Sequence, residues 1–155
     1  MNSPKVVTNT ISIDAPKTEV WNVLTNPAMT RQYMFGCETV SDWNVGSELL
    51  WRGEYEGQPM VFVKGEILEI APDTKLVYTT IDPHSNIDDK AENYLTVTYE
   101  LIAEGPKTQL KVTQGDYAKV AEGERRYQEA YNNGEGWNPI LIEIKKLAEA
   151  NAANS

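Results

Sequence analysis

The sequence predicts an α+β fold in which a curved antiparallel sheet of six to seven strands wraps around a long C-terminal helix. Three observations predict it. Short segments rich in β-branched and aromatic residues recur between turn signals, which is typical of an antiparallel meander. Two short helical patterns follow the first of these segments. Near the C-terminus, one apolar stripe repeats at steps of three or four residues and predicts an amphipathic helix; its members are Trp137, Leu141, Ile144 and Ala148.

The first third of the chain predicts one strand and two short helices. Val6–Ile13 carries β-branched residues at most positions and predicts the first strand. Pro16 suits the first turn of a helix, and the apolar residues that follow keep helical spacing to about Thr25. Asn26-Pro27 ends this helix, and Ala28–Tyr33 predicts a second one.

The middle and the end of the chain predict the rest of the sheet and two more helices. The expected strands are Glu38–Ser41, Ser47–Arg52, Met60–Ile70, Lys75–Ile81, Asn93–Ala103 and Thr108–Gln114. The glycines in Gly53–Pro59 indicate a hairpin loop, and Asp82–Glu92 indicates a polar loop. Ala121–Tyr131 predicts a short helix that Asn132-Asn133-Gly134 ends, and the final helix is expected to begin near Asn138.

Length and composition limit the classes of protein. A chain of 155 residues predicts a single domain, with its core at about residues 6–150. The net charge of −9 disfavours nucleic acid and anionic membranes, because both are bound through Lys and Arg. No signal peptide and no apolar segment long enough to cross a membrane is found, so we expect a cytoplasmic protein without membrane insertion. Both a monomer and a homodimer fit the sequence.

Four groups of short motifs carry a resemblance to a known family. In chain order they are Ile11-Ser12-Ile13-Asp14-Ala15-Pro16 with Val20-Trp21 and Leu24-Thr25; Gly65-Glu66-Ile67-Leu68-Glu69-Ile70-Ala71-Pro72 with Leu76-Val77-Tyr78; Val97-Thr98-Tyr99-Glu100-Leu101 before Gly105 and Thr108; and Gly136-Trp137 with Leu141. The chain resembles the helix-grip fold of the START/Bet v 1-like (SRPBCC) superfamily, in the branch related to the C-terminal domain of the Hsp90 ATPase activator Aha1. The resemblance covers roughly Thr8 to Ala150. It implies the fold and not one activity, because such folds include lipid carriers, hormone binders, polyketide cyclases and co-chaperones.

This fold implies an internal cavity, because a strongly bent sheet cannot pack flush against a straight helix. Strand alternation gives the expected walls apolar side chains. Gly65, in the middle of a strand, indicates either a bend of the sheet or the close approach of another group. Four tryptophans and eight tyrosines against two phenylalanines favour walls with polar positions over a dry core.

We therefore predict which side chains bind a ligand in this cavity. The predicted cavity residues are Trp51, Val63, Tyr78, Tyr94, Tyr99, Tyr127, Tyr131, Trp137 and Leu141. The predicted mouth consists of Met34, Phe35 and His84. For each aromatic residue taken alone, a plain core position is the competing interpretation.

The sequence offers no recognisable catalytic constellation. No Cys/His cluster has the spacing of a metal site, no glycine-rich loop precedes a helix, and we expect no metal or other cofactor. His84 could act as a general base at the cavity rim, or it could be an exposed loop residue. Cys37 fits a small buried apolar residue better than a reactive thiol, and a single cysteine cannot form an internal disulfide.

Three functions remain as hypotheses. The first is the binding of an apolar or aromatic small molecule or lipid in the cavity. The second is a cyclase- or hydrolase-like reaction in the same cavity. The third is an interaction module of the Hsp90 co-chaperone type, with a chaperone as partner.

Overall fold

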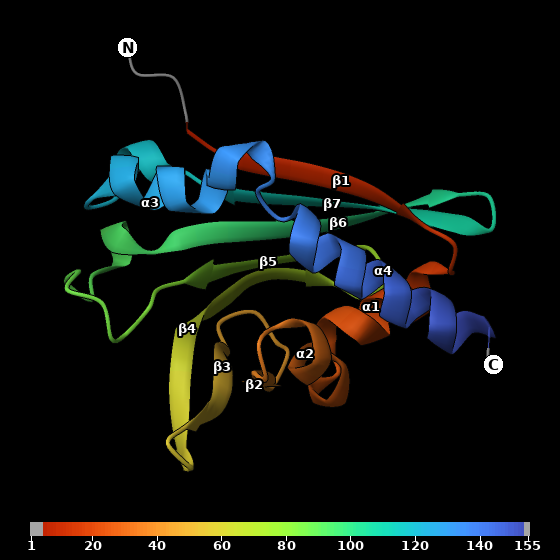
Figure 1. The fold of residues 1–155 in the computed structure, drawn as a ribbon, viewed down its shortest axis with the longest axis horizontal. Coiled ribbons are helices and arrows are strands. Elements are labelled where there is room, and N and C mark those ends of the chain that lie inside the picture. Colours follow the sequence, from red (N-terminus) through yellow and green to blue (C-terminus); the bar gives the residue numbers. More distant parts are fainter. Residues whose placement is uncertain (1–4, 154–155) are drawn as a thin grey trace.

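The computed structural model describes residues 5–153 and has the predicted α+β helix-grip architecture (Figure 1). One seven-stranded antiparallel sheet has the strand order β1-β7-β6-β5-β4-β3-β2. Its strands are β1 (Val7–Ile13), β2 (Glu38–Ser41), β3 (Glu48–Tyr55), β4 (Gln58–Ala71), β5 (Lys75–Thr80), β6 (Leu95–Glu104) and β7 (Lys107–Gly115). In the part of the chain that the structure describes, no helix is long and apolar enough to cross a membrane.

Four α-helices lie around this sheet. They are α1 (Lys17–Thr25), α2 (Pro27–Tyr33), α3 (Gly123–Tyr131) and α4 (Asn138–Ala153), with short 3₁₀ turns at Ala91–Asn93, Tyr117–Lys119 and Asn132–Gly134. Asn26 ends α1 and caps α2, where its side chain accepts a hydrogen bond of 3.0 Å from the Ala28 N–H. The long helix α4 packs against β1 and α1, as Figure 1 shows.

The prediction of a long hairpin loop over Gly53–Pro59 was wrong. β3 continues to Tyr55 and β4 begins at Gln58, so only Glu56-Gly57 form the turn. Both turn residues have positive φ, at 52° and 78°, as two-residue hairpins require. Gly53 lies inside β3, where it leaves room for the Phe62 ring, whose edge would lie 3.1 Å from a Cβ at this position.

The sheet bends within β4, which exchanges one partner strand for another along its length. Its first half pairs with β3 up to Glu66, and its second half pairs with β5 from Ile67 onward. At this change of partner, a Cβ on Gly65 would lie 1.6 Å from the carbonyl oxygen of Thr79. The Glu66 N–H donates to the Thr79 hydroxyl at 3.0 Å. Both interpretations of Gly65 therefore hold, because the sheet bends where another backbone approaches.

The bent sheet gives its inner face two different halves. In the half beside α4, opposed residues of neighbouring strands form closed rows, and all of them are buried: Leu76, Tyr99 and Val112 in one row, and Leu101 and Leu110 in the next. Leu141, Ile144 and Ala148 of α4 belong to the same core. The other half of the inner face is not closed in this way.

Candidate functional site

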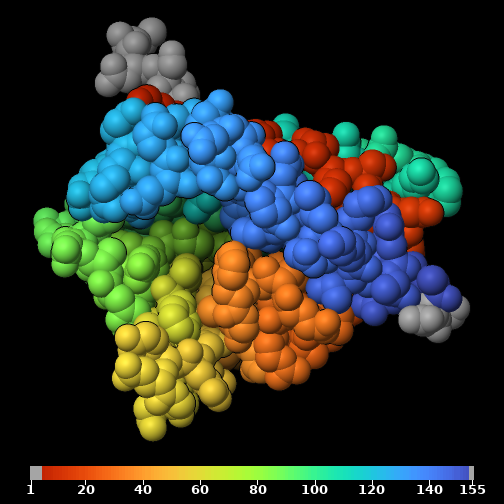
Figure 2. Space-filling model, in the orientation of Figure 1, coloured from red at the N-terminus to blue at the C-terminus, as the bar shows by residue number. Residues whose placement is uncertain are grey.

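A pocket of about 480 Å³ lies on the open half of the inner face. Its floor is the next row of the sheet, in which Tyr78, Val97 and Gln114 stand opposite one another on β5, β6 and β7. The full lining is Met34, Phe35, Cys37, Trp51, Phe62, Val63, Tyr78, Thr80, Val97, Gln114, Glu129, Ala130, Asn132, Gly136, Trp137 and Ile140. In the space-filling view, the surface is hollowed between α3, the segment around α2 and the strands (Figure 2). The pocket volume lies within the usual range for small-molecule sites, about 300–1,000 Å³.

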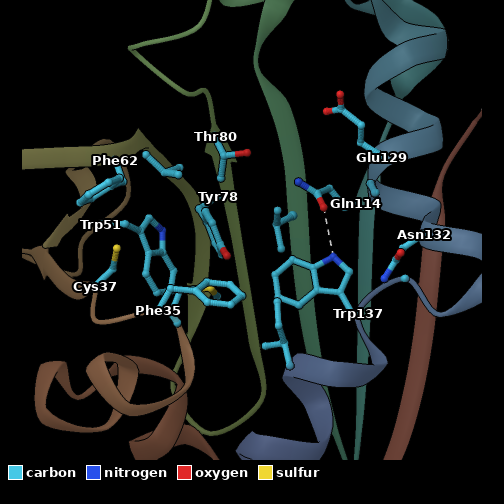
Figure 3. A pocket seen from close by; sticks show the side chains of 16 residues that line it. Phe35, Cys37, Trp51, Phe62, Tyr78, Thr80, Gln114, Glu129, Asn132 and Trp137 are labelled. Atoms are coloured by element: carbon cyan, nitrogen blue, oxygen red, sulfur yellow. Dashed lines mark hydrogen bonds between the residues drawn. The ribbon is translucent and has the colours of Figure 1, made fainter. Parts of the chain in front are cut away.

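Trp137 separates the pocket from the closed core, and hydrogen bonds to two side chains fix its position. Its backbone N–H donates to Asn9 Oδ1 at 2.9 Å, and its indole N–H donates to Gln114 Oε1 at 3.0 Å (Figure 3). The Asn9 amide also donates to the carbonyl oxygen of Glu135 at 3.3 Å. Gly136 has φ of +51°, and a Cβ there would lie 2.4 Å from Asn9 Oδ1, so this position requires glycine.

A continuous series of aromatic rings runs from one wall to the other. The ring centroids of Trp51 and Tyr78 are 6.3 Å apart, those of Tyr78 and Tyr99 are 5.5 Å apart, and those of Tyr99 and Trp137 are 6.1 Å apart. The Tyr78 and Tyr99 hydroxyls lie 2.8 Å apart and form a hydrogen bond. Burial raises the pKa of both phenols well above the usual value, so both stay neutral. The rings are tilted or edge-on to one another, and three of them, Trp51, Tyr78 and Trp137, line the pocket with uncharged aromatic surface.

The mouth is formed by the turn after α2. Phe35 has positive φ of 53° and is 87% exposed, although it is a large apolar side chain. Figure 3 shows Trp51 and Trp137 on opposite sides of the pocket, with Phe35 between them in this view. The next residues are Gly36, also with positive φ, and Cys37, which is buried. Burial raises the pKa of the Cys37 thiol, which favours the neutral apolar form over a reactive thiolate.

The third wall comes from α3 and the turn that follows it, through Glu129, Ala130 and Asn132. No residue of α3 is fully buried. Tyr127 joins the helix to the rest of the molecule, because its ring meets the Tyr117 ring edge-on at 5.7 Å and lies 5.5 Å from the Lys5 ammonium. It also stacks on Tyr131 of the same helix, at 5.7 Å. The wall is therefore attached through a small number of contacts.

The structure brings six of the predicted site residues together around the pocket. They are Trp51, Val63, Tyr78 and Trp137 of the predicted cavity, and Met34 and Phe35 of the predicted mouth. That these side chains bind a ligand stays a prediction.

The other six predicted site residues lie outside the lining. Tyr99 and Leu141 are fully buried in the closed core. Tyr127 and Tyr131 stack on each other along α3. The last two hold the loop after β5 against the sheet: Tyr94 donates to the Asp89 carboxylate at 2.6 Å, and His84 Nε2 lies 2.8 Å from the carbonyl oxygen of Val61.

Sequence reasoning did not include several residues that line the pocket. Phe62 was missed because of a β-bulge: Trp51 pairs with Val63 and Arg52 pairs with Val61, so Phe62 is the extra residue between them. Strand alternation alone assigns Phe62 to the outer face. Gln114 and Thr80 had a usable signal, since alternation places them on the inner face with Val112 and Tyr78.

The titratable groups of the lining are few. Glu129 is the one formally charged residue, and its carboxylate is exposed at the rim and accepts a hydrogen bond of 3.1 Å from Arg125. Between residues 5 and 153, no group of three or more His, Cys, Asp or Glu side chains is arranged to hold a metal ion. The geometry offers an apolar, aromatic pocket with a small number of neutral polar groups: Tyr78, Thr80, Gln114 and Asn132.

Comparison with known proteins places the chain in a family. The family model described as "Activator of Hsp90 ATPase homolog 1-like protein" matches residues 14–149. No curated protein gives a significant match to the chain. The solved structure of ChR145 from Cytophaga hutchinsonii is similar, with 32% identity, coverage of 99% of both chains and a TM-score of 0.75.

Two other solved structures share the fold at lower identity. PFC0360w, an HSP90 activator from Plasmodium falciparum, has 21% identity, coverage of 89% of this chain and 94% of its own, and a TM-score of 0.61. The Aha1 dimer from Colwellia psychrerythraea has 14% identity, coverage of 93% and 96%, and a TM-score of 0.66. The architecture and the family model agree: the chain belongs to the Activator of Hsp90 ATPase homolog 1-like family, in the Aha1-like branch of the START/Bet v 1-like superfamily.

Proposed function

We propose that this protein binds an apolar or aromatic small molecule in the pocket between the bent sheet, α3 and the beginning of α4. The observation that carries the proposal is the pocket itself, which holds about 480 Å³ between aromatic and aliphatic side chains. An apolar ligand there removes its surface from water, at about 25 cal/mol for each Å² buried. The exposed Phe35 at the mouth would lose exposed apolar surface as well.

Binding is better supported than catalysis by the groups that line the pocket. A general acid or base is expected to be a titratable group with a perturbed environment near the reacting atoms. Glu129 is exposed and paired with Arg125, the Cys37 thiol is held neutral by burial, and His84 lies outside the lining. These placements favour a carrier or a ligand sensor over a cyclase or hydrolase.

A matched pair of alanine substitutions tests the proposal. Ala130→Phe adds a ring inside the pocket, whereas Ala150→Phe adds the same ring to an exposed position of α4. We expect Ala130→Phe to weaken the binding of the neutral dye Nile red at least tenfold, because the ring fills the space that the dye needs. Ala150→Phe should bind the dye like the unsubstituted protein.

The measurement is a fluorescence titration, with circular dichroism to show that both variants are folded. Equal dye affinity in all three folded proteins would place the dye elsewhere and contradict the proposal. Native mass spectrometry of the purified protein adds a search for a bound small molecule.

A second candidate is activation of an Hsp90-type chaperone, which the family match favours. Its test is the ATPase rate of a purified Hsp90-type chaperone with and without this protein. An increased rate that Ala130→Phe leaves unchanged would assign the protein to the co-chaperone function and make the pocket dispensable for it.

A further inference from the structure

We infer that the Gln114 carboxamide selects the ligand, and that the ligand is a neutral aromatic molecule with a carbonyl oxygen that accepts a hydrogen bond from Gln114 Nε2. This inference rests on the proposed function and names the class of ligand. It is carried by the hydrogen bond between Gln114 and Trp137, by the position of Gln114 in the sheet and by the charges of the lining.

The first step is the orientation of the carboxamide. An indole N–H can only donate, so the atom of Gln114 that lies 3.0 Å from Trp137 Nε1 must be the carbonyl oxygen. The amide nitrogen therefore points away from Trp137, and Figure 3 shows it directed into the pocket. No hydrogen-bond partner of this nitrogen is found among residues 5–153. The pocket thus presents an N–H donor whose direction is fixed by a neighbouring ring.

The second step is the position of this donor relative to the apolar walls. Gln114, Val97 and Tyr78 stand opposite one another on adjacent strands. Two strand spacings separate Gln114 from Tyr78, or about 10 Å. A ligand whose oxygen meets Gln114 can therefore lay a body of two fused rings over Val97 and Tyr78, toward Trp51.

The third step is charge. The lining contains no Lys or Arg, and its one formal charge is the Glu129 carboxylate. The chain as a whole carries a net charge of −9. A carboxylate or phosphate moved into this pocket would lose its hydration without gaining a cation, which is costly. A neutral acceptor such as a ketone or amide oxygen loses much less and gains the Gln114 N–H.

The test uses three probes with one ring system: acetylnaphthalene, which has a carbonyl group; ethylnaphthalene, which has none; and naphthoate, which is anionic. The informative quantity is the ratio of the affinities for acetylnaphthalene and ethylnaphthalene, compared between variants, because the intrinsic hydrophobicity of the probes then cancels. Gln114→Glu keeps an acceptor for the Trp137 indole and removes the donor, and Gln114→Met removes the donor without adding charge. Gln109→Glu makes the same charge change on the same strand at a position outside the lining.

We expect both Gln114 variants to lower this ratio about five- to tenfold, the value of one neutral hydrogen bond. Gln109→Glu should leave the ratio within about twofold of the unsubstituted protein, since Gln109 is outside the pocket. Naphthoate should bind at least tenfold more weakly than acetylnaphthalene. In the unsubstituted protein, acetylnaphthalene should shift the side-chain amide resonances of Gln114 in a nitrogen-15 spectrum more than ethylnaphthalene does, which needs no variant.

Trp137→Phe provides a separate test of orientation. Without the indole N–H, the carboxamide is free to turn, so the ratio should fall while ethylnaphthalene still binds. An unchanged ratio in both Gln114 variants, or naphthoate binding as tightly as acetylnaphthalene, would overturn the assignment of Gln114 and leave apolar binding intact. Failure of all three probes to bind would instead remove the proposed function, and this inference with it.

Discussion

The hydroxyl groups of Tyr78 and Tyr99 illustrate how one residue's position decides the role of its polar atom. They lie 2.8 Å apart and are each other's hydrogen-bond partner. Both side chains are almost completely buried, and Tyr78 in addition lines the pocket. Either hydroxyl can donate in this hydrogen bond. Of the two side chains, only Tyr78 belongs to the pocket lining, so its hydroxyl is the one that a change in the pocket can reach.

This asymmetry predicts unequal effects of two matched substitutions on stability. Tyr78→Phe leaves the buried Tyr99 hydroxyl without a partner and should lower the free energy of unfolding by about 1–3 kcal/mol. Tyr99→Phe removes the buried hydroxyl and should cost less, about 1 kcal/mol, because the Tyr78 hydroxyl borders the pocket and can bind water. The double variant should lose less than the sum of the two, as expected for directly coupled groups.

Denaturant unfolding of the four proteins gives the three differences in free energy. Equal and additive losses would contradict the difference in surroundings between the two hydroxyls. They would show that both hydroxyls are equally accessible to water.

At the scale of elements, β4 is the strand that creates the pocket. Its pairing with β3 ends at Glu66 and its pairing with β5 begins at Ile67, directly after Gly65, and the sheet bends there. Beyond the bend in β4, the inner face of the sheet packs closely against α4. Before the bend it does not. The pocket is the space that the bend leaves.

Gly65→Ala should therefore be strongly destabilising. The added Cβ would lie 1.6 Å from a backbone carbonyl oxygen of the neighbouring strand, which cannot move without breaking the sheet. We expect a loss of about 3 kcal/mol or more, at the upper end of the range for overpacking. The matched control is Gly53→Ala, in the middle of β3, where the nearest atom is the movable ring edge of Phe62 at 3.1 Å.

Thermal unfolding of both variants provides the comparison. Gly65→Ala should lower the unfolding temperature far more than Gly53→Ala. Similar temperatures for the two would mean that β4 can straighten at Gly65, and that the bend does not depend on glycine.

The same elements show what could be predicted from the sequence. Side-chain spacing and turn residues predicted the seven strands and four α-helices to within a few residues, except that β3 and β4 continue through most of the expected Gly53–Pro59 loop, and alternation placed Tyr78, Val97 and Gln114 on one face. The bulge that turns Phe62 inward could not be predicted, because it depends on how β3 and β4 pair and not on either strand alone. Tyr127 and Tyr131 were assigned to the cavity by residue type, but their rings stack on each other along α3, and Tyr127 packs against Tyr117 and the Lys5 ammonium from the other end of the chain.

At the scale of the whole molecule, four of the eight tyrosines are buried. Burial raises the pKa of Tyr33, Tyr78 and Tyr99 well above the ordinary 10.0, and it raises the pKa of Tyr117 to about 12. Tyr33 donates to the carbonyl oxygen of Leu24 at 3.3 Å, so its proton is also used in a hydrogen bond. The folded protein therefore keeps protons on these groups at a pH where the unfolded chain releases them.

This difference predicts a loss of stability in alkali. Below pH 10 both states hold the phenol protons, so stability is unaffected by them. Above pH 10 the unfolded chain binds fewer protons than the folded one, and stability falls by about 1.4 kcal/mol per pH unit for each such tyrosine. For Tyr117 the fall continues to about pH 12, its pKa in the folded state. Denaturant unfolding between pH 9 and pH 12 should show the decline.

Tyrosinate absorbance and circular dichroism, followed together, distinguish this mechanism from the general effect of alkali on ion pairs. The absorbance of the buried phenols should rise in the same transition in which the folded signal is lost. In Tyr117→Phe the free energy of unfolding should fall less steeply with pH, by the contribution of about one proton, because the variant has one fewer tyrosine with a raised pKa. Full ionisation of all eight tyrosines while the protein remains folded would contradict the closed core on which the division into core and pocket depends.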